Sequence, residues 1–170
     1  MRRALDALYD GAAWLAALFM IALLAMVLLS VLGRELHFHV RGTDAYAGYC
    51  MAGAGFLALA HTLKRGEHIR VTLLLAALPP RARHALELWA HGAAVLMSGL
   101  LAFYAARLAW QSHAFNDIST GNDATPLWIP QLGMALGTLI LFIAFVDEFA
   151  LELRGRRTSV PAEGEFTRNE

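Results

Sequence analysis

Ionisable side chains inside apolar segments are the residues of this sequence best placed to do chemistry, because charge in hydrocarbon is costly and usually serves a purpose. His61 lies near the end of one apolar segment, and Glu87 and His91 lie near the start of the next. Glu87 and His91 are four positions apart and share one face of a helix. We expect the three to form a polar cluster at interface depth, satisfied by one another, by water or by headgroups.

Two other uses of this candidate cluster stay open. A proton-linked or partner-binding role would suit ionisable groups at this depth. His61 and His91 could also ligate a haem between two helices, although nothing else in the sequence supports haem. We therefore expect no cofactor and no catalysed reaction.

Metal and thiol chemistry have little support in the sequence. His37 and His39 are spaced for one side of an extended segment, but no third ligand is evident, so we expect no metal site. Cys50 is the single cysteine, which excludes an intrachain disulfide and a CxxC site. Arg34 and Asp44 flank the same loop, and we expect them to pair with each other, with a partner or with lipid headgroups.

Composition places these residues in a membrane protein. The chain has 170 residues, of which 58% are hydrophobic, and residues 11–33 include no Asp, Glu, Lys, Arg or His. Such a run exceeds the roughly 20 residues that cross a hydrocarbon core. The apolar runs are continuous and do not alternate, which indicates helices and not a barrel.

Four apolar segments predict an all-α protein with four transmembrane helices, at about 11–32, 45–63, 86–106 and 127–147. Thr43 or Asp44 is expected to cap the second helix, and Thr125 with Pro126 to begin the fourth. Residues 69–78 are too few to span and predict a short amphipathic helix lying in the interface. Residues 1–153 form the predicted transmembrane domain, and the polar residues 154–170 a disordered tail.

Small residues are expected to carry the packing between helices, since they let backbones approach closely in lipid. One stripe lies in the second segment, and a GxxxG motif lies in the fourth. Together the predicted packing residues are Gly48, Ala52, Gly55, Gly133 and Gly137.

Positive charge gives the orientation. Four spans place both termini and the loop 64–83 on one side, and that side carries eleven of the fourteen Lys and Arg residues. Arg34, Arg41 and Arg107 are on the other side. By the positive-inside rule both termini are cytoplasmic. The loop residues expected at a lipid or partner interface are Arg65, His68, Arg70, Arg81 and Arg83.

The same loop carries a family resemblance. The segment 66–71 reads GEHIRV and the segment 78–83 reads LPPRAR, which resembles the G-x-H-I-x-V and L-P-basic pattern of the small membrane subunit (DctQ type) of tripartite ATP-independent periplasmic (TRAP) transporters. Gly33-Arg34 and the segment 125–130, TPLWIP, are similar to further pieces of that pattern. The sequence departs from it where an acidic pair usually opens the second helix, because Asp44 is the only carboxylate there.

The resemblance implies a non-catalytic scaffold in the bacterial or archaeal inner membrane. Such subunits pair with a large multi-span membrane subunit that holds the sodium and substrate sites. A periplasmic binding protein delivers the substrate, often a dicarboxylate or another organic acid. The residues leave two alternatives, a b-type haem anchor of a redox complex and a small homodimeric exporter. The charge-free first span opposes the exporter, which would need a carboxylate there.

Overall fold

The computed structural model describes residues 2–38, 40–65 and 79–153. Four helices lie in these ranges: α1 (Arg2–Glu35), α2 (Thr43–Lys64), α4 (Pro80–Ala114) and α5 (Trp128–Leu153). In the described part of the chain the only β pairing is an isolated bridge between Ile118 and Pro126. The predicted interfacial helix at 69–78 and the predicted tail at 154–170 fall outside the described residues.

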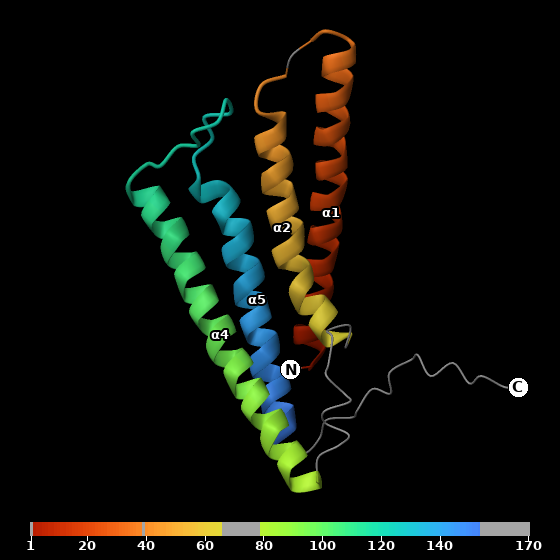
Figure 1. Cartoon of the computed structure of the whole chain (residues 1–170), viewed down its shortest axis with the longest axis vertical. Coiled ribbons are helices and arrows are strands. Elements are labelled where there is room, and N and C mark those ends of the chain that lie inside the picture. Colours follow the sequence, from red (N-terminus) through yellow and green to blue (C-terminus); the bar gives the residue numbers. More distant parts are fainter. Residues whose placement is uncertain (1, 39, 66–78, 154–170) are drawn as a thin grey trace, which may run out of the picture.

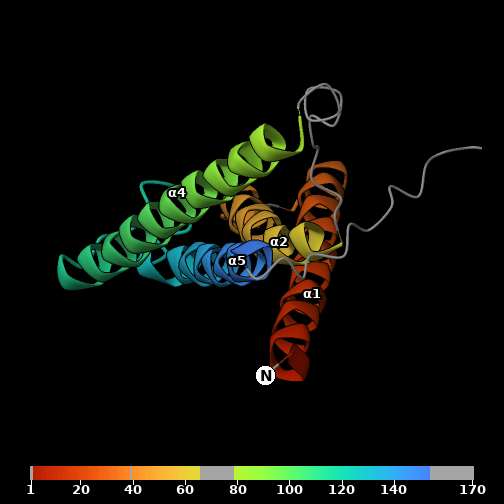
Figure 2. The same cartoon turned by 90° about the horizontal axis from the view of Figure 1, so that it is seen from below.

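The helices lie side by side in the order α1, α2, α5, α4 (Figures 1 and 2). Helix α2 packs against α1 on one side and α5 on the other, and α5 packs against α4. Helix α1 begins, α2 ends, α4 begins and α5 ends at the same end of this row, which we call the base (Figure 1). Residues 36–38, 40–42 and 115–127 lie at the opposite end, the top (Figure 1).

Each pair of neighbouring helices meets at a glycine. A Cβ on Gly53 of α2 would lie 3.2 Å from the Phe19 ring of α1, and one on Gly99 of α4 would lie 3.0 Å from the Phe142 ring of α5. The closest approach is at Gly137 of α5, where a Cβ would lie 2.5 Å from the backbone carbon of Phe56. Here α2 and α5 touch through their backbones, so a side chain would force them apart.

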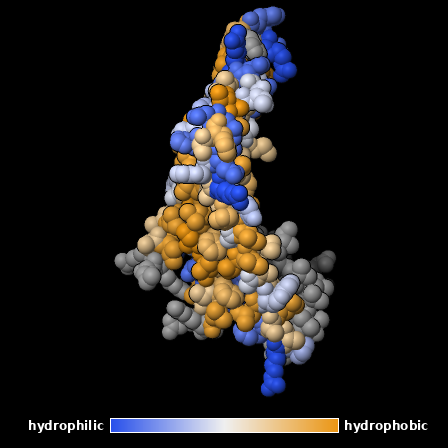
Figure 3. Space-filling model, turned by 90° about the vertical axis from the view of Figure 1, so that its left-hand side faces the viewer, coloured by the Kyte–Doolittle hydropathy of each residue, from blue (hydrophilic) through white to orange (hydrophobic). Residues whose placement is uncertain are grey.

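Three of the described helices, α1, α4 and α5, are long and apolar enough to cross a membrane. On the face shown in Figure 3, apolar side chains form a belt between more hydrophilic ends. The exposed residues Leu96, Met97 and Phe103 of α4 contribute to the apolar surface. Water would penalise so much exposed hydrocarbon, whereas lipid or a partner helix would not.

The prediction of helices over all four apolar segments is confirmed, but the helices are longer than those segments. Helix α4 starts at Pro80, which is tolerated at the first position of a helix because its missing N–H would have no helical partner there. Helix α2, at 22 residues, is not among the three helices that are apolar enough to cross a membrane, because small residues, tyrosines and His61 interrupt its apolar stretch.

Two predicted helix starts are wrong. Gly42 caps α2 in a left-handed conformation with a φ of 80°, and no side chain caps it. Asp44 instead accepts a hydrogen bond from Ser30 of α1, at 3.2 Å. Helix α5 begins at Trp128, because Pro126 is held in the bridge to Ile118 and the Thr125 carbonyl accepts the N–H of Ser119.

Candidate functional site

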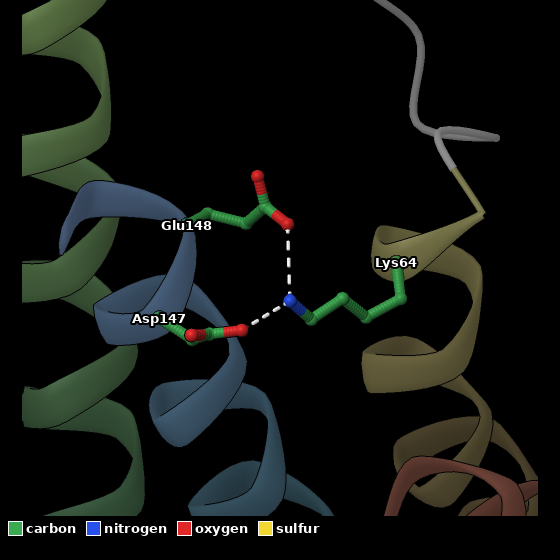
Figure 4. Close-up of polar contacts among 3 residues, drawn as sticks. All are labelled: Lys64, Asp147 and Glu148. Carbon is green, nitrogen blue, oxygen red and sulfur yellow. Dashed lines mark hydrogen bonds and ion pairs between the residues drawn. The ribbon is translucent and has the colours of Figure 1, made fainter. Parts of the chain in front are cut away.

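The main polar feature between the helices is an ion cluster at the base. Lys64, the last residue of α2, points its ammonium at the carboxylates of Asp147 and Glu148 on α5 (Figure 4). The Lys64 Nζ donates a hydrogen bond to Asp147 Oδ2 and another to Glu148 Oε1, the second at 3.2 Å. We call these three residues the base cluster.

The base cluster is partly shielded from solvent. The side chains of Lys64, Asp147 and Glu148 are 21%, 25% and 15% exposed. Partial burial strengthens charge-assisted hydrogen bonds and makes it costly to remove one partner. The ammonium also lies 5.3 Å from the ring centroid of Tyr9, so α1 contributes a cation–π contact. One cation thus touches three helices and fixes their relative positions.

A second polar network lies at the top, where the connection 115–127 docks onto α2. The Tyr49 hydroxyl donates to Asp123 Oδ2 at 2.9 Å, and the Ser119 hydroxyl donates to Asp123 Oδ1 at 2.8 Å. Desolvation acts to raise the pKa of Asp123, but hydrogen bonds from Ser119, Thr125 and Tyr49 outweigh it and lower the pKa to about 2. Asp123 therefore stays ionised and holds the connection in place.

Gly42 makes this docking possible. A Cβ at Gly42 would lie 2.7 Å from the Cβ of Asp123, and its φ of 80° is one that residues with side chains rarely adopt. The connection therefore rests directly on the first turn of α2.

Arg34 and Asp44 lie on the wall of one pocket at the top, with a volume of about 440 Å³. His37 lines the same pocket and has a φ of 57°. The Phe38 N–H bonds to the Gly33 carbonyl and the His37 N–H to the Arg34 carbonyl, so His37 closes the C-terminus of α1 in a Schellman-type turn. Among the described contacts there is no ion pair between Arg34 and Asp44.

The residues of the predicted polar cluster have these described contacts. His61 faces α1, with its Nδ1 3.6 Å from Asp10 Oδ1. Glu87 pairs with Arg83 one turn earlier in α4, at 3.2 Å. His91 Nδ1 lies 2.7 Å from the Glu87 carbonyl oxygen. Glu87 and His91 thus share a face of α4 as predicted from their spacing, while the described partner of His61 is on α1.

Three of the predicted interface arginines, Arg65, Arg81 and Arg83, lie at the base. Arg65 follows α2, and its N–H bonds to the carbonyls of His61 and Leu63. Arg81 and Arg83 are exposed in the first turn of α4. His68 and Arg70 fall outside the described residues. A role for any of these residues at a lipid or partner interface stays a prediction.

The predicted packing glycines fall into two groups. Gly133 and Gly137 face α2, where Gly133 lies close to Gly53. A Cβ added to Gly48 or Gly55 would meet nothing within 4 Å among the described residues. If these two glycines and Ala52 of the same stripe pack closely against a helix, that helix would belong to another chain.

Sequence reasoning missed the base cluster and Asp123. Asp147 and Glu148 are adjacent carboxylates at the end of a strongly apolar segment, and that position is the signal that could have singled them out. The charge pattern of the sequence indicates Lys64 only as one of the cations of the loop 64–83. Asp123 gave no signal, because its partners Tyr49 and Ser119 become neighbours only when the chain folds.

No curated protein matches the chain. The family model for the DctQ component of tripartite ATP-independent periplasmic transporters matches residues 23–155. The match takes in α2, α4, α5, part of the apolar stretch of α1 and the whole base cluster. Because it covers most of the chain, this membrane protein belongs to the DctQ component family of tripartite ATP-independent periplasmic transporters.

Proposed function

We propose that the chain is the non-catalytic scaffold subunit of a sodium-coupled transporter that imports an organic acid, such as a dicarboxylate. In this proposal a large membrane subunit carries the sodium and substrate sites, and a periplasmic binding protein delivers the substrate. The family membership supports the assignment to a small transporter subunit. The base cluster supports the scaffold role, because it ties three helices together at one point.

We further propose that α2 crosses the inner membrane together with α1, α4 and α5, which makes four spans. The base would then face the cytoplasm. Helix α2 has 22 residues, so at 1.5 Å per residue it extends about 33 Å, enough for a core about 30 Å thick. Because α1 and α5 cover two sides of α2, those sides would not face lipid, and this helix does not need an uninterrupted apolar surface. The excess of Lys and Arg at the base supports the orientation.

The open row of helices is the observation that carries the partner proposal. Among the described helices, α1 packs mainly against α2 and α4 mainly against α5, and both expose large apolar side chains. On α1 these include Leu18, Ile21, Leu24 and Leu28. A long apolar face next to a fixed core is suited to hold another membrane subunit.

Co-purification tests the proposal. We expect the tagged chain, co-expressed with the large subunit, to retain that subunit in mild detergent. Leu and Phe are both apolar, so Leu24→Phe alters the shape of the α1 face without making it polar, and it should weaken retention if α1 is the contact. A chain that never retains a multi-span partner, or that transports substrate alone in liposomes, would contradict the scaffold role.

A further inference from the structure

A second cluster of ionisable groups lies at the base, between α4 and α5, and shares no residue with the base cluster. It consists of His84 and Glu87 on the first two turns of α4 and Glu152 at the end of α5. One ligand atom from each residue lies within 4.8 Å of the other two. We propose that these residues, which we call the triad, bind a divalent transition-metal ion of the zinc class. The proposal does not depend on the transport role.

The spacing in the chain suits a metal site. His84 and Glu87 are three positions apart on one helix, which places both side chains on the same face. Glu152 comes from the neighbouring helix, so the ligands converge from two sides. Helical bundles hold metals with a carboxylate and a histidine three positions apart on one helix and a carboxylate from an adjacent helix. There the carboxylate comes first, whereas here the histidine does.

The distances suit zinc. His84 Nδ1 lies 3.5 Å from Glu152 Oε1. Two ligands on a tetrahedral zinc ion, with bonds of about 2.0–2.1 Å, lie about 3.3 Å apart. The spacing of this pair is therefore close to that of two zinc ligands, and a Glu87 oxygen lies within 4.8 Å of both atoms.

The electrostatics also favour a cation. Glu152 is 7% exposed, so its carboxylate lies in an environment with little water. A second carboxylate, that of Glu87, lies within the same 4.8 Å. Two negative charges this close repel each other, and a dication between them offsets the repulsion. Arg83 contacts Glu87 through the Oε1 oxygen, at 3.2 Å, and a carboxylate can hold an arginine with one oxygen and an ion with the other.

The ligand types select the metal class. Imidazole and carboxylate together suit zinc and its first-row neighbours, whereas magnesium and calcium prefer all-oxygen sites. Three protein ligands leave a fourth position for water. The His84 side chain is 60% exposed, so an ion can enter from solvent. Once bound, it would connect the start of α4 to the end of α5.

The test uses the full chain in mild detergent, without a histidine tag. A calorimetric titration with zinc chloride should give a binding stoichiometry of about one ion per chain. Saturating zinc should raise the melting temperature by about 5 °C, as expected for a ligand well above its dissociation constant. Magnesium chloride at the same concentration should do neither.

Variants assign the binding to the triad. His84→Ala and Glu152→Gln should weaken zinc binding at least about tenfold and abolish the melting shift. His84→Cys should retain binding, because a thiolate is a good zinc ligand. His113→Ala, at the far end of α4, is the matched histidine control and should bind like the unaltered chain.

Three results would overturn the proposal: no zinc binding by the unaltered chain, equal stabilisation by magnesium, or unchanged zinc affinity in His84→Ala. The last would place the ion elsewhere, for example at His37. His84 is largely exposed, so its substitution should not unfold the chain. The melting temperature of each variant in a chelator checks this point.

Discussion

Lys64 shows how one side chain can order several helices. It ends α2, contacts two carboxylates of α5 and lies over the Tyr9 ring of α1. Its long apolar stem lets the ammonium reach these partners while the helix backbone stays in place. A cation in this position determines which turns of α2 and α5 are level with each other.

Lys64→Met should therefore destabilise the chain by about 1–3 kcal/mol, because it keeps the apolar stem but takes this cation away from two adjacent, partly shielded carboxylates. The melting temperature in detergent measures the change. Arg65→Met is the matched control, since Arg65 is exposed. This variant should lower the melting temperature much less. Equal shifts would show that the base cluster adds no stability.

Removing the Tyr9 hydroxyl should stabilise the chain, in contrast to the loss of the Lys64 cation. Tyr9 is 2% exposed, and its hydroxyl has no hydrogen-bond partner among the described residues. Tyr9→Phe removes this unsatisfied group and keeps the ring beneath Lys64, so it should stabilise the chain by about 1 kcal/mol. Tyr104→Phe, at an exposed tyrosine, should be nearly neutral. A destabilised Tyr9→Phe would mean that the hydroxyl is satisfied by a bound water or partner.

Asp123 predicts a pH dependence. The pKa of Asp123 falls from an ordinary 3.8 to about 2 on folding. Its stabilising contribution is therefore complete above about pH 4 and is lost as the pH falls through about 2. The melting-temperature difference between the unaltered chain and Asp123→Asn should shrink across this window. Asp117→Asn, at an exposed aspartate in the same connection, is the matched control for removing a carboxylate there.

At the scale of the elements, the glycine contacts decide how closely helices pack. Gly137 brings α5 onto the backbone of α2 at Phe56, whereas the close contacts of Gly53 and Gly99 are with aromatic rings. A ring can turn aside for an added methyl group, but backbone cannot. The α2–α5 crossing is therefore the least adaptable contact in the row.

Gly137→Ala should destabilise the chain by about 1–3 kcal/mol, because the new methyl overlaps the Phe56 backbone. Gly55→Ala is the control, since nothing lies within 4 Å of its added carbon among the described residues. Helix propensity should make that variant neutral or slightly more stable. If Gly55→Ala keeps its melting temperature but loses the large subunit in co-purification, the stripe of Gly48, Ala52 and Gly55 faces the partner.

The elements also show what the sequence could predict. Apolar length predicted all four helices, because that signal is local and long. It missed the ends, since α4 continues into polar residues on both sides and Pro126 is held by a contact with Ile118. It likewise missed the pairing of Lys64 with Asp147, because no local pattern says which helices are neighbours. Spacing placed Glu87 and His91 on one face but could not reveal Asp10 as the partner of His61.

At the scale of the whole molecule, the orientation can be measured directly. In a Cys50→Ser background, we expect a membrane-impermeant maleimide to label Asn122→Cys in intact spheroplasts. Arg81→Cys should be labelled only after the membrane is opened. Both positions are exposed or partly exposed, and they lie at opposite ends of the row. The reverse pattern would invert the proposed orientation, and equal labelling of both would contradict the proposal that α4 crosses the membrane.

The spatial order of the helices has a consequence for biogenesis. The chain is synthesised as α1, α2, α4, α5, but α5 lies between α2 and α4. Each half can form a hairpin from its own sequence, α1 with α2 and α4 with α5. The halves meet chiefly through α5, the last helix to leave the ribosome, and through Lys64 with its two carboxylates. Until translation reaches Asp147 and Glu148, the ammonium of Lys64 has no partner on α5, so this contact between the two hairpins can form only after most of α5 has been synthesised.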